Sequence, residues 1–262
     1  MALVDFGDVQ INVQEDGDPD GAPVVFSNSL GTTLHMWDPI MPLLPEGIRI
    51  IRYDKRGHGL SSLPQGPYKM GQLIHDAERV IDHCGIRDSL FVGLSIGGLI
   101  AQGLASKRLD LIRAMVLSNT GAKIGTREMW ADRIETIGAN GMEWAADAIM
   151  ERWFSRKFRA SPELAPWRKM LVDTPLEGYL ACSAAIAGTD LYTQTASLTL
   201  PTLAIAGTED GSTPPDLVRE TGALIKGSSF YLVRGAGHLP CVEKPQEYAD
   251  VLTGFFKSTG HI

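Results

Sequence analysis

A single serine, Ser95, stands in the uncharged run FVGLSIGGLIAQGLA, residues 91–105. Residues 93–97 match the pattern G-x-S-x-G, in which a serine occupies a sharp turn between a strand and a helix. Side chains at Gly93 and Gly97 would collide with the neighbouring strand and helix, which explains the flanking glycines. The turn places a hydroxyl at a helix amino terminus, where backbone N–H groups stabilise developing negative charge. The pattern therefore predicts a nucleophilic serine.

Such a serine needs a general base, and the base needs an acid that orients it. His238, in the segment RGAGHLPCVEKP, is the only histidine between Ser95 and the last two residues of the chain. In one large class of serine enzymes the order along the chain is serine, acid, histidine. The segment AIAGTEDGSTPP supplies the neighbouring acids Glu209 and Asp210, whereas the earlier loop SNTGAK contains none. We predict Asp210, because adjacent loop side chains point apart and the shorter acid is usual in this position.

Two backbone N–H groups should hold the oxyanion of the reaction intermediate. One is the N–H that follows the nucleophile, on Ile96. The other lies in the segment FSNSLGTTLHMW, and we expect it at Leu30, where Gly31 lets the backbone approach closely. The chain has no HGGG motif of the kind found in many lipases, so bulky lipid esters are disfavoured as substrates.

Short apolar runs, punctuated by glycine and proline, predict the strands that position these residues. Most are nearly continuous in Val, Ile and Leu, as parallel strands covered on both faces should be. Helical periodicity lies between them, with apolar residues 74, 77, 81 and 84 on one stripe and a last helix that opens near residue 245. The fold class is therefore α/β, with a mostly parallel, doubly wound sheet. The expected strands are residues 23–29, 48–54, 89–93, 113–119, 201–207 and 229–235.

The alternation of strands and helices breaks between about residues 121 and 195, where the sequence is helical throughout and holds four of the five tryptophans. We expect residues 1–121 and 195–262 to form the core domain and residues 122–194 to form an inserted helical cap over one edge of the sheet.

Composition excludes several other classes of protein. A net charge of −7, without a basic block, argues against nucleic acid as a partner. Three widely separated cysteines indicate a reducing compartment, and the amino terminus lacks a signal peptide, so a cytoplasmic location is expected. The uncharged run of residues 89–106 contains four glycines and is short for a membrane span, so no membrane association is expected. No metal-ligand spacing is present.

Five segments, read together, resemble the 3-oxoadipate enol-lactonases of the α/β-hydrolase superfamily. The resemblance runs through essentially the whole chain, including the expected cap, and implies the α/β-hydrolase fold. It also implies hydrolysis of a small enol-lactone with a carboxylate arm to 3-oxoadipate, in the degradation of aromatic compounds, without cofactor or metal. The segments are SNSLGTTLHMWDP, RYDKRGHGLS, GLSIGGLIAQGLA, AGTEDGSTPP and GAGHLPCVEKP.

An anionic lactone substrate requires a cation near the pocket. Arg133 is our candidate, because it lies one helical turn after Trp130, which would form a wall of the pocket. Arg56 and His58 are expected to order their own loop instead, and Trp37 is expected to be packing.

Other functions share these motifs. A broad small-ester carboxylesterase or perhydrolase, or a carbon–carbon bond hydrolase, would carry the same three residues. A dehalogenase is disfavoured, since it needs a carboxylate nucleophile at position 95. A ligand receptor without catalytic function on the same scaffold is the alternative from a different class. The sequence leaves the oligomeric state open, a homo-oligomer included.

Overall fold

The computed structural model describes residues 2–262 and contains a single eight-stranded sheet. Six neighbouring strands run parallel, and the order across the sheet is β1-β2-β4-β3-β5-β6-β7-β8. The six expected strands are all present, which confirms the predicted α/β-hydrolase architecture. The strands are β1 (Ala2–Asp5), β2 (Gln10–Gly17), β3 (Ala22–Ser27), β4 (Ile48–Tyr53), β5 (Ser89–Leu94), β6 (Ile112–Ser118), β7 (Thr202–Gly207) and β8 (Ser229–Val233).

The first two strands, β1 and β2, were not among the expected ones. They form an antiparallel hairpin at the edge of the sheet, and β2 pairs antiparallel with β4. In β2 only three consecutive residues are fully buried, and the rest of the strand is polar and exposed or half-buried. Such a short buried stretch within a mostly polar strand gives a weak sequence signal.

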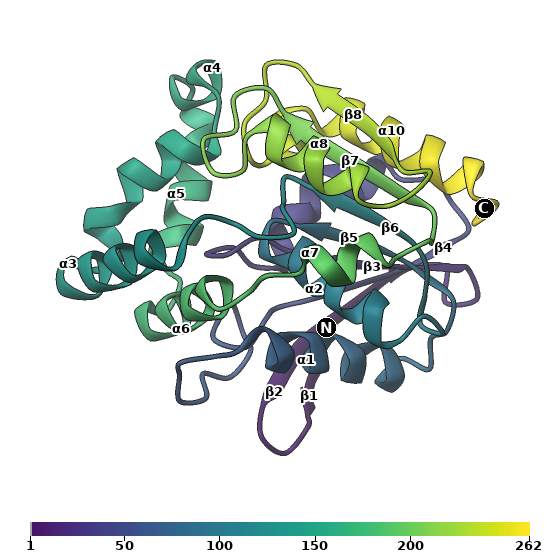
Figure 1. The fold of residues 1–262 in the computed structure, drawn as a ribbon, viewed down its shortest axis with the longest axis horizontal. Helices are drawn as coiled ribbons and strands as arrows, with labels where there is room; N and C mark the ends of the chain where they lie inside the picture. Colours follow the sequence, from purple (N-terminus) through teal and green to yellow (C-terminus); the bar gives the residue numbers. More distant parts are fainter. Residues whose placement is uncertain (1) are drawn as a thin grey trace.

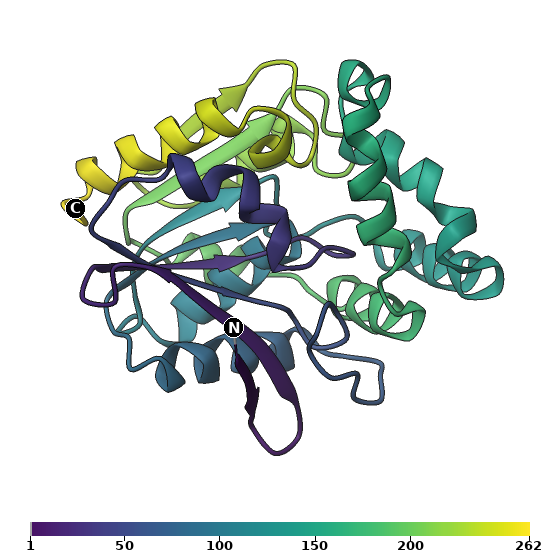
Figure 2. The same ribbon diagram turned by 180° about the vertical axis from the view of Figure 1, so that it is seen from behind.

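Helices cover both faces of the sheet. Figure 1 shows α2 (Ile96–Lys107) and α8 (Pro215–Ala223) in front of it, and Figure 2 shows the 3₁₀ helix η1 (Leu34–Leu43) and α10 (Pro245–Ser258) on the opposite face. The helix α1 (Met70–His83) packs beside α2, and the short α9 (Pro240–Glu243) packs on η1 and α10. The arrangement has three layers, with the β5 strand at the centre of the sheet buried along its whole length.

The remaining helices gather at one end of the molecule (Figures 1 and 2), between β6 and β7 in the sequence. The long α3 (Arg127–Trp153) consists of two arms that meet at Gly141, where φ is 84°. It packs against α5 (Ala165–Val172) and α6 (Leu176–Ala187), and α4 (Arg156–Arg159) and η2 (Pro162–Leu164) connect them. The next helix, α7 (Tyr192–Ala196), packs instead on α2 of the core. We refer to residues 127–187 as the cap helices; the division at 121/122 and 194/195 stays a prediction.

The uncharged run around Ser95 is buried because it forms β5 and α2, the innermost strand and helix. Within residues 2–262, no helix combines the length and apolar character needed to cross a membrane. The three cysteines, Cys84, Cys182 and Cys241, are buried free thiols.

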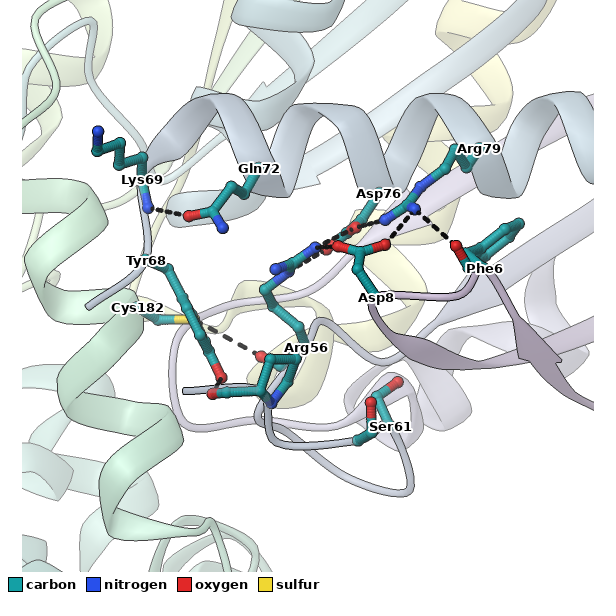
Figure 3. Close-up of polar contacts among 12 residues, drawn as sticks. Phe6, Asp8, Arg56, Ser61, Tyr68, Lys69, Gln72, Asp76, Arg79 and Cys182 are labelled. Carbon is teal, nitrogen blue, oxygen red and sulfur yellow. Dashed lines mark hydrogen bonds and ion pairs between the residues drawn. The ribbon is translucent and has the colours of Figure 1, made fainter. Parts of the chain in front are cut away.

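A buried ion-pair cluster anchors the loop that follows β4 (Figure 3). The Arg56 guanidinium binds the carboxylate of Asp76 on α1 at 2.6 Å, and Arg79 reaches the same carboxylate. Both arginines also pair with Asp8 in the turn of the first hairpin. The Cys182 thiol on α6 donates to the Arg56 carbonyl at 3.8 Å. The cluster therefore ties this loop to the hairpin, to α1 and to the cap helices.

Candidate active site

Ser95 lies on the turn between β5 and α2 with φ at 59° and ψ at −119°, a backbone conformation that only a strongly constrained non-glycine residue adopts. Its N–H donates to the Ser118 carbonyl of β6 at 3.0 Å, and its carbonyl accepts from the Thr120 hydroxyl at 2.7 Å. These bonds to the adjacent strand and loop hold the turn. The side chain is 7% exposed.

The two glycines beside Ser95 are required by close packing. A Cβ on Gly93 would overlap the Gly97 carbonyl, and a Cβ on Gly97 would overlap the Ser27 carbonyl of β3. Neither clash involves a flexible side chain, so any larger residue would force backbone apart. The steric reason inferred from the sequence therefore applies in the structure.

Asp210 and His238 come from the loops after β7 and β8 and form a buried pair. The imidazole Nδ1 lies 2.8 Å from Asp210 Oδ2. Because a carboxylate only accepts hydrogen bonds, the proton of the neutral ring lies on Nδ1, and Nε2 keeps the lone pair of a general base. Burial by itself raises the pKa of Asp210, but its interactions with His238, followed by the hydrogen bond from the Asn119 amide, bring that pKa below its ordinary value. The acid therefore stays ionised.

Two residues that the sequence analysis missed complete the setting of Asp210. The Asn119 amide and the Thr213 hydroxyl donate to Oδ2 at 2.9 and 2.7 Å, while Oδ1 accepts the backbone N–H groups of Ser212 and Thr213. Glu209 points elsewhere and accepts the Arg156 N–H. Of the two candidate acids, the structure thus brings Asp210 to the imidazole. The asparagine follows β6, so its place after a parallel strand was the available signal.

Ser95 and His238 line one cavity, but within the described residues no hydrogen bond joins their side chains. His238 Nε2 lies 3.4 Å from the hydroxyl of Ser29, a cavity residue that the sequence analysis did not single out. Catalytic hydrogen bonds are often long or unformed in enzymes without substrate. The Ser95 hydroxyl turns on one rotatable bond, so its direction can change without movement of the backbone.

The loop after β3 carries the expected oxyanion donor. Leu30 lines the cavity, and across residues 2–262 the N–H groups of Leu30 and Ile96 donate to no other group. Gly31 has φ at 73°, and its N–H donates to His58 Nε2 at 2.9 Å. Burial, followed by the charge of Lys55, lowers the pKa of His58 well below its ordinary value, so the ring is neutral and accepts this bond. His58 therefore orders the loop after β3, which carries Leu30, in addition to its own loop.

The carboxyl end of α3 is bonded to both loops that carry the acid and the base. The His238 N–H donates to the Trp153 carbonyl at 2.7 Å, and the Gly211 N–H donates to the Arg152 carbonyl at 3.0 Å. The second arm of α3 thus contacts the catalytic loops through its main chain.

The cavity has a volume of about 70 Å³ and lies between the sheet edge and the cap helices. Its described lining contains two arginines and no Asp or Glu. The lining residues are Ser29, Leu30, Ser95, Ile124, Gly125, Met129, Trp130, Arg133, Arg152, Trp153, Tyr179, Ile186, Ser212, Thr213 and His238.

Trp130 and Arg133 both line this cavity, as their spacing suggested. The Arg133 guanidinium donates to the Tyr179 hydroxyl at 2.6 Å and lies over the Trp130 ring, 5.3 Å from its centroid. Trp130 is itself fixed by a hydrogen bond from its indole to the Ile124 carbonyl. No carboxylate of residues 2–262 pairs with Arg133, so the charge remains available to a ligand.

Arg152, on the second arm of α3, is a second cation in the cavity that the sequence analysis missed. Burial, and then repulsion from Arg133, lower the pKa of its guanidinium. Its buried Nε has no hydrogen-bond partner among the described residues. Two half-buried guanidinium groups without a carboxylate favour an anionic ligand. The kink at Gly141 interrupts the helical register, so residue spacing along the sequence did not indicate that Arg152 and Arg133 line the same cavity.

Within the described chain, no group of three or more His, Cys, Asp and Glu side chains is placed to hold a metal ion.

Comparisons with known proteins identify the family and the fold. The model of the alpha/beta hydrolase family matches residues 17–251. Two 3-oxoadipate enol-lactonases from Acinetobacter baylyi are each 34% identical to this chain over 95% of its length, and over 94% and 93% of their own. An enol-lactonase from Burkholderia xenovorans superposes with a TM-score of 0.94 at 34% identity, over 98% of this chain and all of the other. A hydrolase from Pseudomonas aeruginosa gives 0.93 at 36% identity, over 97% of each chain.

The match thus extends through the core, the catalytic loops and the cap helices. This chain belongs to the alpha/beta hydrolase family, among the 3-oxoadipate enol-lactonases, and is an enzyme of the class that hydrolyses lactones and esters.

Proposed function

We propose that this protein is a serine hydrolase that opens a small enol-lactone carrying a carboxylate, with 3-oxoadipate enol-lactone as the substrate. The observation that carries the proposal is one cavity that contains Ser95, the imidazole oriented by Asp210, and two arginines without acidic partners. The names of the relatives support the choice of lactone. The same assignment makes the protein a cytoplasmic enzyme of aromatic-compound degradation, which its buried free thiols fit.

The first step forms an acyl-enzyme. His238 Nε2 takes the Ser95 proton as the hydroxyl oxygen attacks the lactone carbonyl carbon. The tetrahedral oxyanion lies against the N–H groups of Leu30 and Ile96, which have no competing acceptor. Collapse of the intermediate breaks the ring C–O bond, and the enol oxygen leaves with the proton returned by His238. The enol then becomes a ketone, which makes the ring opening favourable.

The second step releases the product. His238 removes a proton from water, the resulting hydroxide attacks the acyl carbon, and the Ser95 oxygen leaves with that proton. Asp210 remains ionised and stabilises the imidazolium that exists during both transfers.

The carboxylate arm of the substrate is placed by the cap helices. Arg133 and Arg152 supply the charge, and the Trp130 ring supplies an apolar wall. A guanidinium fork fits a carboxylate with two parallel hydrogen bonds. The proposed ligand is therefore a small monoanion.

A broad small-ester hydrolase is the second candidate. The solved structure of a thermophilic esterase from Thermogutta terrifontis superposes with a TM-score of 0.89 at 25% identity. An esterase without need for an anion would hydrolyse a neutral methyl ester as well as the anionic lactone.

The deciding experiment is a spectrophotometric assay with 3-oxoadipate enol-lactone, run beside Ser95→Ala. We expect turnover by the parent and none above background in the variant. Activity that survives in Ser95→Ala would refute the serine mechanism. A parent that hydrolyses p-nitrophenyl acetate but not the lactone would refute the substrate and leave the mechanism standing.

A further inference from the structure

Lys55, in the loop after β4, is buried with 1% exposure, yet it pairs with no carboxylate of the described chain. Its ammonium donates instead to the carbonyls of Ser29 at 2.9 Å and Asn28 at 3.1 Å. The neighbouring acid, Asp54, is occupied by other donors, among them the Leu34 N–H at 2.7 Å. Burial of a charge without an ionic partner is costly. This cost needs an explanation beyond loop structure.

One of the two carbonyls that Lys55 binds, that of Ser29, belongs to the peptide group between Ser29 and Leu30. The Ser29 carbonyl also accepts the Thr32 hydroxyl at 2.8 Å, so two donors engage its oxygen. The same peptide group ends in the Leu30 N–H, which has no acceptor in residues 2–262 and lies at the cavity. Donors on a carbonyl draw electron density to the oxygen and make the N–H of that peptide a stronger donor.

We propose that Lys55 is a positioning residue of the oxyanion hole, which fixes and polarises the Ser29–Leu30 peptide so that the Leu30 N–H binds the anionic intermediate more strongly. The inference rests on the proposed serine mechanism. Lys55 is not among the residues that line the cavity. It acts through one peptide group, and its positive charge favours the transition state, in which the oxyanion has formed, over the uncharged ground state.

The proposal has a pH signature. Burial lowers the pKa of Lys55 to about 8, and the nearby Cys182 on α6 and the carboxylate of Asp54 oppose this shift in part. His58 on the same loop faces Lys55 as a neutral ring. The ammonium is therefore present below about pH 8 and is lost as the pH rises through that value. The stabilisation of the oxyanion should be lost with it.

The test compares Lys55→Met with Thr32→Val, which removes the neutral donor from the same carbonyl, and with Tyr53→Phe. The Tyr53 hydroxyl pairs with the Ser27 hydroxyl nearby at 2.9 Å and, within residues 2–262, forms no hydrogen bond with Ser29 or Leu30, so its loss controls for a buried polar deletion. Initial rates with p-nitrophenyl acetate are measured from pH 6 to 9.5, with Ser95→Ala as the background.

Loss of a whole oxyanion donor costs about 10²–10³ in kcat, so weakening one donor should cost about tenfold. We expect that loss in Lys55→Met at pH 7 with KM within about twofold, since the effect is confined to the transition state. The fall in wild-type kcat near pH 8 should vanish in Lys55→Met and persist in Thr32→Val, whose kcat drops less. Tyr53→Phe should match the parent.

The proposal is overturned if Lys55→Met keeps kcat within about twofold of the parent, or keeps the alkaline fall. If Lys55→Met does not fold, as seen by circular dichroism, the other variants decide. A parent profile without a fall near pH 8, or a Thr32→Val variant equal to the parent, then overturns it. Activity of Ser95→Ala would instead refute the serine mechanism, so the two failures are distinguishable.

Discussion

Replacing Asp210 by Asn tests the acid–base pair most directly, because the substitution changes charge and hydrogen bonding but hardly changes shape. One oxygen of the carboxylate accepts two backbone N–H groups, and these cannot turn away. The amide oxygen of the new side chain must therefore occupy that position. Its NH₂ group then faces the donors that Oδ2 now accepts, from Asn119, Thr213 and His238.

The imidazole can only respond by accepting at Nδ1, which moves its proton to Nε2. That nitrogen then faces the cavity as a donor and cannot take the Ser95 proton. An Asp→Asn change with this consequence in a serine protease lowers kcat by about 10⁴, which corresponds to about 5 kcal/mol in the activation free energy. We expect a loss of that size here, with little change in KM, because binding of the ground state does not use the tautomer.

The assay is steady-state hydrolysis of the enol-lactone at pH 7, with Glu209→Gln as the matched control. Glu209 precedes Asp210 but, within the described residues, its side chain accepts only the Arg156 N–H, so the control should keep wild-type kcat. Circular dichroism and thermal melts verify that both variants are folded. A kcat for Asp210→Asn within tenfold of the parent would refute the assigned pair, and an equal loss in Glu209→Gln would show that the loop alone is at fault.

Three further predictions concern binding, packing and pH. Arg133→Gln should lower kcat/KM for the anionic lactone by about tenfold to a hundredfold, as the loss of a charged hydrogen bond predicts. The kcat/KM for the neutral ester p-nitrophenyl acetate should not change. Equal losses for both substrates would contradict the assignment of Arg133 to the substrate carboxylate. In denaturant unfolding, Gly97→Ala should lower the free energy of unfolding by on the order of 3 kcal/mol or more, because the new Cβ meets the Ser27 carbonyl. Gly71 in α1 has open space around it, so Gly71→Ala should raise the free energy of unfolding by about 0.5–1 kcal/mol. Burial and Lys55 lower the pKa of His58, so as the pH falls below 6.5 the unfolded chain binds a proton at this residue before the folded chain does. The free energy of unfolding should therefore fall between pH 7 and 5.5, and less steeply in His58→Gln. The same slope in both proteins would exclude His58 as the cause.

Much of the site could be predicted from the sequence because its parts are local patterns. The turn around Ser95 can be recognised from the two glycines that close packing requires. Parallel strands bring their carboxyl ends to one edge of the sheet, which places the loops of Asp210 and His238 together. Main-chain donors such as the Leu30 N–H follow from loop position alone. These features depend on order along the chain and on steric need.

What the sequence did not reveal depends on contacts between distant segments. Arg152 joins Arg133 only because α3 bends at Gly141, and no periodicity signals a bend of that kind. Lys55 looks like a surface lysine in sequence, and only the buried path of its side chain to the Ser29 carbonyl shows otherwise. The first hairpin was missed because β1 is only four residues long and β2 is mostly polar.

The main-chain bonds between the end of α3 and the loops of the acid and the base bear on how this enzyme could change its substrate during evolution or by engineering. A graft that exchanges the whole insertion would supply new carbonyls at positions 152 and 153, and any misfit there would move the imidazole of His238. The first arm of α3 carries Trp130 and Arg133 and lacks these bonds, so it is free to vary. We therefore expect the substrate range to change through substitutions in residues 127–140. The second arm should vary less, because its main-chain bonds hold the loops of Asp210 and His238 in place.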